Sequence, residues 1–202
     1  YNRYGYRLSD RSARDQSGRS MFRNTLRDLG VLGKRSIEKE IPSDYMNGSE
    51  LQRLYLLQGL LDTDGTVDKS GSIQYCSSSR KLADQVRQLV WSLGGVCKIR
   101  SKIPHYTKPD GERIECARTY ILNIRMSNPK QLFRLERKRS RLSDTYKFEN
   151  SLKLGIKSIE FVGRKEAQCI TIDHPQHLYI TNDYVVTHNS IAAVAICCYV
   201  LY

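Results

Sequence analysis

The sequence predicts an α+β fold, and two observations support that class. Up to about residue 142, stretches with apolar residues at helical spacing alternate with stretches in which apolar and polar residues alternate. After about residue 157, the chain changes to short β-rich runs separated by turn residues. We therefore expect an α/β unit followed by an all-β segment, with a boundary within residues 150–158.

Helices are expected mainly in the first region. Ser49 and Gln52 have the spacing of a capping box, which marks the start of a helix, and Gly65 marks its end. Residues 38–48 contain a proline and a glycine and are predicted to form a linker. The predicted helices cover residues 21–33, 50–64, 80–95 and 128–142.

Strands are expected between these helices. Along residues 96–103, Lys98, Arg100 and Lys102 fall on one face of an extended chain and apolar residues fall on the other. This pattern is typical of a half-buried strand with a basic outer face. Residues 105–115 are expected to form a loop. The predicted strands cover residues 71–79, 96–103 and 117–126 in the first region, and 157–173, 177–181 and 184–189 in the second.

Composition bounds the class of partner and the location. The net charge of +12, from 33 Lys and Arg against 21 Asp and Glu, favours nucleic acid as a polyanionic partner over a merely basic surface. The six Cys residues have no CxxC spacing, so we expect reduced thiols, no structural zinc and a cytoplasmic location. The polar N-terminus does not resemble a signal peptide. The apolar run from Ile191 is shorter than the ~20 residues that span a bilayer, so no membrane association is expected.

The stretch "LLQGLLDTDG" places Asp62 and Asp64 at the end of an apolar helix. A calcium loop of the EF-hand type would place Leu60 and Gly71 where carboxylates are required, so that interpretation fails. An Asp-Gly turn that ends a helix is the simpler alternative.

Within this stretch, "LQGLLDTDG" resembles the motif of the LAGLIDADG homing endonucleases, and the following elements resemble one repeat of that fold. The resemblance implies that the helix packs against a second motif helix, with Gly59 at the close approach. It implies that Asp64 is a catalytic metal ligand and that Mg²⁺ assists phosphodiester hydrolysis. It also places a catalytic lysine near the metal, for which Lys138 is the candidate; a solvated basic helix is the alternative there.

The same resemblance implies double-stranded DNA as the substrate, with antiparallel strands in the major groove, whose width admits a β-ribbon. A solvated sheet face is the alternative explanation of these charges. The residues expected to contact DNA are Lys98, Arg100, Lys102, Arg118 and Arg125.

Only one copy of the motif is found. We expect residues 1–155 to form the endonuclease-like region, with the end of a first repeat at residues 1–42 and a second repeat at residues 43–150. One copy supplies one of the two metal aspartates that such an enzyme needs, so a decayed, structural endonuclease or a plain DNA-binding region are alternatives.

The stretch "VVTHNS" ends in His188, Asn189 and Ser190. An Asn side-chain amide can attack its own backbone carbonyl, which closes a succinimide and cleaves the following peptide bond when the geometry is fixed. An adjacent imidazole can protonate the leaving nitrogen, and a hydroxyl can accept an acyl group as an ester. These are the residue types of a C-terminal protein-splicing junction. Alternatively, Asn189 or Ser190 caps a helix that begins at Ile191.

The longer stretch "AQCITIDHPQHLYITNDYVVTHN" resembles the C-terminal splicing blocks of inteins. The resemblance implies that residues 156–189 are C-terminal strands of a Hint-type all-β splicing domain, which needs no cofactor. It makes His177 the internal His of the block and Cys169 a residue of the splicing site, with a buried structural Cys as the alternative. Inteins commonly carry a LAGLIDADG endonuclease ahead of these blocks, so the two resemblances support each other.

Residues 190–202 are then expected to be a C-extein, a piece of the host protein. They resemble the helix after a Walker A loop, and a phage terminase large subunit is the expected host. Inteins begin with Cys, Ser or Thr, so Tyr1 predicts a C-terminal portion, either of a split intein or of a longer one. The expected partners are an N-terminal intein fragment, double-stranded DNA and the host protein, in a microbe or phage; an acidic N-terminal fragment is a second possible ligand of the basic surface.

Overall fold

The computed structural model describes residues 20–144 and 170–188, with a few isolated residues between 152 and 166. The boundary expected at residues 150–158 falls largely outside the described residues, and the C-extein expected at residues 190–202 falls wholly outside them. In the described ranges, no helix combines the length and the apolar character that a membrane crossing requires.

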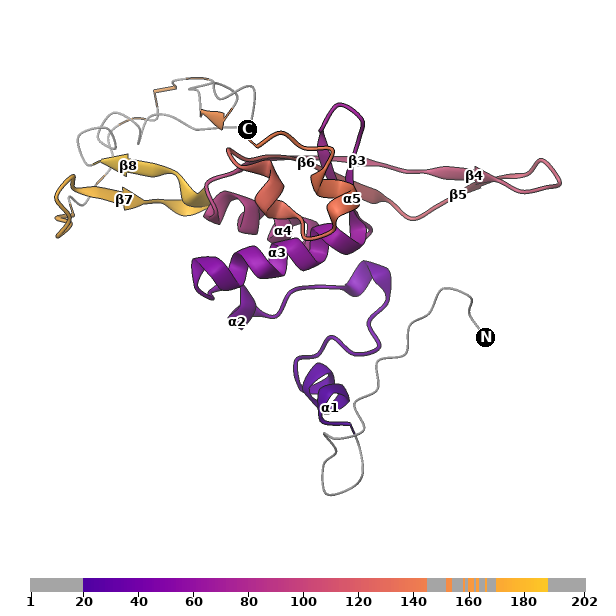
Figure 1. The fold of residues 1–202 in the computed structure, drawn as a ribbon. Coiled ribbons are helices and arrows are strands. Elements are labelled where there is room, and N and C mark those ends of the chain that lie inside the picture. Colours follow the sequence, from indigo (N-terminus) through magenta and orange to yellow (C-terminus); the bar gives the residue numbers. More distant parts are fainter. Residues whose placement is uncertain are drawn as a thin grey trace.

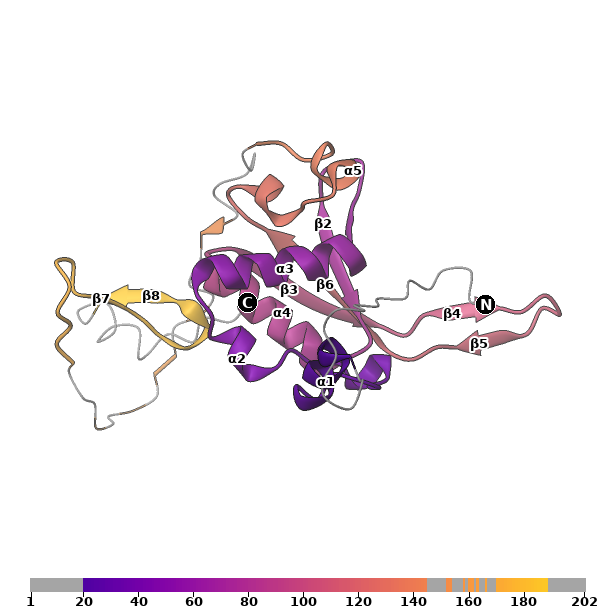
Figure 2. The same ribbon diagram turned by 60° about the horizontal axis from the view of Figure 1, so that its bottom comes forward.

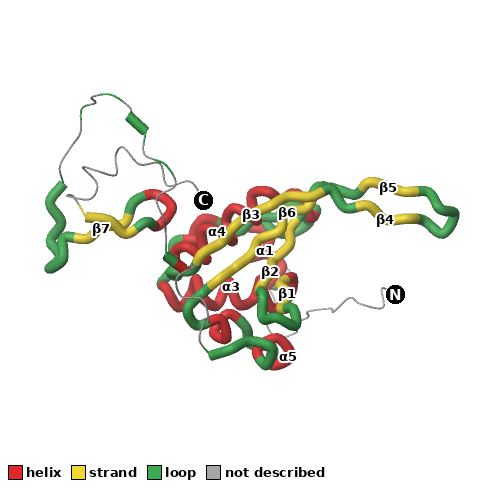
Figure 3. Tube along the Cα trace, turned by 90° about the horizontal axis from the view of Figure 1, so that it is seen from above, coloured by secondary structure: helices red, strands yellow, loops and turns green. Residues whose placement is uncertain are grey.

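The centre of the fold is a four-stranded antiparallel sheet with two helices on one of its faces (Figures 1 and 2). The strand order is β1-β2-β6-β3, so β1 and β3 are the edge strands. Figure 3 looks onto the other face of the sheet, where the strands lie in front of the helices. The strands are β1 (Gly65–Val67), β2 (Ile73–Ser77), β3 (Val96–Lys102) and β6 (Thr119–Arg125), and the helices are α3 (Glu50–Asp64) and α4 (Arg80–Ser92).

The main hydrophobic core lies between the sheet and these two helices. Leu57 and Leu61 of α3, Val86 of α4, Tyr75 of β2 and Leu122 of β6 are all 0% exposed. Burying one such Leu side chain contributes about 1.5–3 kcal/mol, so the contact between the layers holds the unit together.

The start and the end of α3 follow from local chemistry, as the sequence predicts. The Ser49 hydroxyl accepts a hydrogen bond from the Gln52 N–H, and the Gln52 side chain accepts one from the Ser49 N–H at 2.8 Å. At the other end, a Cβ on Gly65 would lie 2.5 Å from the Leu61 carbonyl oxygen. Only glycine fits there without a shift of the backbone, so Gly65 allows β1 to leave the helix end at a sharp angle.

The three strands predicted in the first region are confirmed as β2, β3 and β6, and the helix predicted at residues 80–95 is confirmed as α4. The prediction omits β1, whose three residues follow α3 directly. The helix predicted at residues 21–33 is shorter than expected: α1 (Met21–Asp28) ends where Gly30 takes a φ of 66°.

The prediction that residues 38–48 form a linker is wrong, because this segment is fixed against α4. The Gln85 side chain accepts from the Ile41 N–H at 2.8 Å and donates to the Ile41 carbonyl at 2.7 Å. Glu40 pairs with Lys34 and Lys81, whose hydrogen bonds lower the pKa of Glu40 to about 2. Two short helices, η1 (Ser36–Glu38) and α2 (Ser43–Met46), flank this contact.

The predicted loop at residues 105–115 is also wrong, because it forms a β-hairpin. β4 (His105–Thr107) pairs with β5 (Arg113–Glu115), and the hairpin extends β3 and β6 far beyond the sheet (Figure 1). Gly111, with a φ of 89°, closes the turn, and the side chains of Lys108 and Glu112 form an ion pair at 2.6 Å. Pro109, Asp110 and Gly111 therefore lie in the turn of a hairpin between two strands.

The helix predicted at residues 128–142 is largely wrong. The chain forms a 3₁₀ turn, η2 (Pro129–Leu132), then runs extended, and then forms one short helix, α5 (Glu136–Arg139). In the extended part, the backbone N–H groups of Arg134 and Leu135 donate to Asp62 of α3 and not to carbonyls of a helix of their own.

The described part of the C-terminal segment is a hairpin. β7 (Leu178–Ile180) pairs with β8 (Val186–His188), which confirms the strand predicted at residues 177–181 and, over residues 186–188, the strand predicted at residues 184–189. The turn η4 (Asn182–Tyr184) joins them and lies against α4. Residues 170–173, the described end of the strand predicted at residues 157–173, are not in a strand, and a Hint-type domain stays a prediction.

Candidate functional site

The C-terminal end of α3 presents a free carboxylate. Asp64 is the last residue of α3 and is exposed. Among the described residues, none forms a hydrogen bond or an ion pair with its side chain. Asp64 is therefore available to a ligand from solution, as the sequence predicts for a metal ligand.

Asp62 has a different environment, although it lies only two residues before Asp64 in the same motif. Its two carboxylate oxygens accept from the backbone N–H groups of Arg134 and Leu135, at 3.0 and 3.3 Å. These two N–H groups belong to the extended chain between η2 and α5, so Asp62 holds that segment beside α3. The motif thus divides its two aspartates into a structural one and a free one.

Lys138 lies beside this helix end, as the sequence predicts, but its ammonium is bound to the backbone. It is only 6% exposed and donates to the carbonyls of Leu61, Asp62 and Gly65 at 2.7, 2.8 and 2.6 Å. A lysine has three N–H donors, so these bonds use all of them. In this arrangement Lys138 binds three carbonyls at and just after the C-terminal end of α3, of which that of Leu61 also accepts from the Gly65 N–H.

Burial lowers the pKa of Lys138, and the nearby charge of Arg137 lowers it further, while Asp62 and Asp64 oppose the shift. The three carbonyl acceptors favour the charged form of the ammonium. Lys138 therefore adds a buried positive charge next to the free carboxylate of Asp64, and it does so from a fixed position.

The segment from Gln131 to Lys138 forms a strap along α3. Besides the contacts of Asp62 and Lys138, the Gln58 amide donates to the Gln131 carbonyl at 2.6 Å and accepts from Arg134 Nε at 2.9 Å. The Arg134 guanidinium also lies 4.6 Å from the centre of the Tyr55 ring. Four residues of α3 thus contact this one downstream segment, which fixes the helix end; they are Tyr55, Gln58, Leu61 and Asp62.

Replacing Lys138 with Met is expected to lower the free energy of unfolding by about 2–4 kcal/mol, because the carbonyls of Leu61, Asp62 and Gly65 all lose the buried ammonium. Urea denaturation followed by circular dichroism measures the change. Arg137→Met is the matched control, because Arg137 is in the same short helix and is exposed. Equal stability of the two variants would contradict the capping role.

Tyr75 lies behind the free carboxylate and was not singled out by its sequence context. Its ring is fully buried, and its hydroxyl has no hydrogen-bond partner within the part of the chain that the structure describes. Burial raises the pKa of Tyr75, and the charge of Asp64 raises it further. The hydroxyl is thus kept neutral close to Asp64.

The donor set at the α3 end fits one ligand of a magnesium site. No group of three or more His, Cys, Asp or Glu side chains comes together among the described residues. Mg²⁺ in proteins keeps several waters and takes one or two carboxylates together with substrate phosphates. The exposed, unpaired carboxylate of Asp64 suits such a site as a single protein ligand.

The uncovered face of the sheet collects the predicted basic residues. Opposite residues of paired antiparallel strands share a face, and Lys98, Arg100 and Lys102 of β3 lie opposite Asn123, Ile121 and Thr119 of β6. Arg125 has the same parity on β6 and lies on that face as well. The core residues Leu122 and Ile124 alternate with these positions, which identifies the uncovered face.

Arg118 does not join this group. It precedes the first residue of β6 and donates from Nη1 to the Ser101 hydroxyl at 3.3 Å. Ser101 alternates with Arg100 and Lys102 along β3, so its side chain belongs to the helix side of the sheet. Arg118 therefore lies apart from the other four basic residues, and its contact with DNA stays a prediction.

Two amide side chains lie at the centre of the same face and were missed by the sequence interpretation. Gln74 of β2 donates from Nε2 to the Asn123 Oδ1 atom at 3.0 Å, and the two residues are directly opposite in the register. Alternation along "IQYCS" places Gln74 away from the core, but its partner is 49 residues further along the chain. Pattern alone therefore could not pair them.

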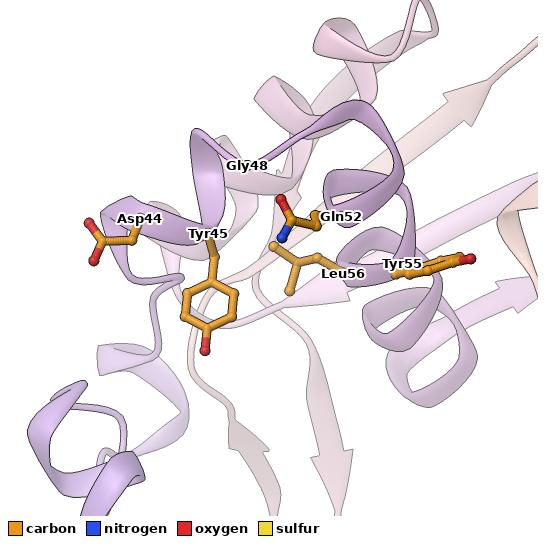
Figure 4. A pocket seen from close by; sticks show the side chains of 6 residues that line it. All are labelled: Asp44, Tyr45, Gly48, Gln52, Tyr55 and Leu56. Carbon is orange, nitrogen blue, oxygen red and sulfur yellow. The ribbon is translucent and has the colours of Figure 1, made fainter.

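The outward side of α3 has an apolar stripe. Leu51 and Tyr55 are 55% and 49% exposed, and Gly59 follows at the same spacing of four residues. A Cβ placed on Gly59 would meet no atom within 4 Å. Figure 4 shows the hollow beside this stripe, at the start of α3, where Tyr45, Gln52 and Leu56 lie around a common space and the ring of Tyr55 points away from them.

The C-terminal hairpin brings two of the predicted splicing residues to one end. Leu178 lies opposite His188 in the register, so His177 and His188 are at the same end of the β7–β8 pair. The His177 Nδ1 atom is 3.1 Å from the Ile172 carbonyl oxygen, and the residue has a φ of 50°. Cys169, Asn189 and Ser190 lie outside the described residues, so their roles stay predictions.

Comparison with known families agrees with this geometry. Residues 51–133 match the family model described as a LAGLIDADG-like domain. The matched range runs from α3 through the four-stranded sheet to the residue after η2, which is the unit that carries Asp64. This part of the chain is a LAGLIDADG-like region with a mixed α+β fold.

A curated relative extends the similarity over most of the chain. Over 171 residues the chain is 36% identical to the replicative DNA helicase DnaB of Mycobacterium intracellulare. The alignment covers 82% of this chain and 27% of the relative, so the chain spans little more than a quarter of that protein.

Proposed function

We propose that the chain is part of an intein whose LAGLIDADG-like region binds double-stranded DNA and, together with a second repeat, cleaves it. The observation that carries the proposal is the combination of a basic, uncovered sheet face with the free carboxylate of Asp64 at the end of the motif helix. LAGLIDADG endonucleases are DNA-cleaving enzymes, so the match over residues 51–133 supports the same substrate.

The second repeat would pack on the outward side of α3. Leu51 and Tyr55 leave apolar area in water there, and Gly59 lets another helix backbone come close. Such a contact would bring a second carboxylate to the end of the helix pair, next to Asp64. The expected source is an N-terminal fragment that carries the other motif copy.

The residues of this chain would divide the work of cleavage as follows. Asp64 would hold Mg²⁺, which supplies charge neutralisation and an activated water when bound. Lys138 would keep the helix end in place through the three carbonyls, and its buried charge would favour phosphate nearby. Lys98, Arg100 and Lys102 would hold the duplex.

DNA binding by this face is tested through its salt dependence. Replacing Lys98, Arg100 and Lys102 together with Ala is expected to weaken binding of a duplex and to reduce the slope of log affinity against log salt by about 3, because each phosphate contact contributes about 0.9. Fluorescence anisotropy on a labelled duplex over a range of salt measures both. A variant with Arg23, Arg27 and Lys39 changed to Ala loses the same charge away from this face, and an equal loss in that control would contradict the proposed surface.

Protein splicing is the second proposed function, and the β7–β8 hairpin favours it. The hairpin ends at His188, directly before Asn189, and has His177 at the same end. We propose that Asn189 cyclises with His188 as general acid, and that Ser190 accepts the N-terminal segment as an ester. Cys169 would line this site, and no cofactor is required.

The similarity to a helicase supports a helicase host over a terminase. Residues 190–202 resemble the helix after a Walker A loop, and the relative is named a replicative DNA helicase. Co-expression with an N-terminal intein fragment that has a host segment fused ahead of it tests the function. Mass spectrometry is expected to find that host segment joined directly to residues 190–202. An unjoined pair of full-length chains would contradict splicing.

A further inference from the structure

The polar residues of the uncovered sheet face are ordered by strand. In the register, Thr66 lies opposite Gln74, Gln74 opposite Asn123, and Asn123 opposite Lys98. One row of side chains therefore crosses all four strands. The row has uncharged amides on the inner strands β2 and β6 and a charge on the edge strand β3.

Two further residues of the basic group follow the same division, while Arg125 lies on the inner strand β6. Arg100 and Lys102 share the edge strand with Lys98, and all three are exposed. The major groove is about 12 Å wide and has phosphates along its walls, while neighbouring strands are about 4.8 Å apart. Two inner strands thus fit over the base edges, and an edge strand comes to a phosphate wall.

The two amides are held in one arrangement. Gln74 Nε2 donates to Asn123 Oδ1 at 3.0 Å, and both side chains are only partly buried. This bond leaves the two N–H donors of the Asn123 amide and the Oε1 acceptor of Gln74 for other partners. In the major groove, adenine presents an acceptor at N7 and a donor at N6, which this pair complements.

We infer that Gln74 and Asn123 determine sequence preference by reading an A·T pair, and that Lys98, Arg100 and Lys102 hold the phosphates on one side. The inference rests on the proposed DNA binding and adds the residues that set specificity. Arg125 lies two residues from Asn123 on the same strand and face, about 7 Å away. If β6 runs along the groove, Arg125 is placed to donate hydrogen bonds to a guanine about two base pairs from that A·T pair.

The test compares preferences selected from a duplex pool with a randomised central segment. Asn123→Ala and Gln74→Thr are expected to lower the preference for A·T at one position, or at two adjacent positions, on the order of 10- to 100-fold. Arg125→Ala should lower the preference for guanine about two base pairs away. Thr is chosen at position 74 because it suits a strand, so that this variant keeps the sheet.

The phosphate-binding residues should behave differently in the same assay. Lys98→Ala and Lys102→Ala are each expected to weaken binding to every selected sequence alike and to reduce the salt slope by about 1. Gln88→Ala is the control amide, since Gln88 is exposed on α4 on the helix side of the sheet. It should change neither the preference nor the slope.

Two results would overturn the inference while DNA binding stands. One is a wild-type preference profile in folded Gln74→Thr and Asn123→Ala; the other is a wild-type chain that binds duplexes without any preference. A wild-type chain that binds no duplex at low salt would instead contradict the proposed function itself. Circular dichroism on each variant shows that the sheet is intact.

Discussion

Replacing Asn189 with Ala is expected to leave residues 190–202 attached to the chain under every condition of complementation. In the proposed reaction, the side-chain nitrogen of Asn189 bonds to the carbonyl carbon of the same residue. The bond from that carbon to the nitrogen of Ser190 breaks, and the departing amine takes up a proton. Alanine has no nitrogen to offer, so the loss should be complete, and mass spectrometry should find neither a free extein nor a terminal succinimide.

Two matched variants give this result its meaning. Asn182→Ala removes an asparagine from the β7–β8 turn, at the other end of the hairpin, and should leave cleavage unchanged. His188→Ala should slow cleavage by about 10²- to 10⁴-fold, because general acid help is lost. Release of residues 190–202 from Asn189→Ala at the wild-type rate would contradict splicing at this junction.

Replacing Asp64 with Asn is expected to reduce Mg²⁺-dependent DNA cleavage by at least about 100-fold, because the substitution removes the one free carboxylate at the α3 end. The assay uses the chain together with the partner that supplies the second repeat, and nicked plasmid is measured on a gel. Affinity for DNA without metal should be retained, because Asn adds no negative charge near the phosphates.

Asp68→Asn is the matched control for that loss. Asp68 is exposed in the turn after β1 and accepts from Ser70 and Ser72, away from the strap. It should cleave like the wild type. Asp62→Asn should lower stability more than cleavage, because Asp62 holds the N–H groups of Arg134 and Leu135. Full cleavage by Asp64→Asn would contradict its assignment as the metal ligand.

The features that the sequence predicts correctly depend on neighbours in the chain. The capping box of Ser49 and Gln52 spans three residues, and the turn at Gly65 requires only the preceding helix. Alternation along β3 places Lys98 and Arg100 outward without knowledge of the partner strand. Local chemistry therefore predicts α3, the outward basic strand and the end of the motif at Asp64.

The features that it misses depend on partners far along the chain. Residues 133–135 do not continue a helix because Asp62, more than 70 residues earlier, binds the N–H groups of Arg134 and Leu135. The pairing of Gln74 with Asn123 requires the register of two strands that are separated in the chain by α4, β3, β4 and β5.

The strap also has a consequence for synthesis on the ribosome. The carbonyls of Asp62 and Gly65 can accept from Lys138 only when Lys138 has left the exit tunnel, more than 70 residues later. Until then the C-terminal end of α3 lacks the contacts of the strap, and these contacts do not yet fix the position of Asp64. If the proposed cleavage of DNA takes place, a prematurely terminated chain would thus lack the ordered helix end that it requires.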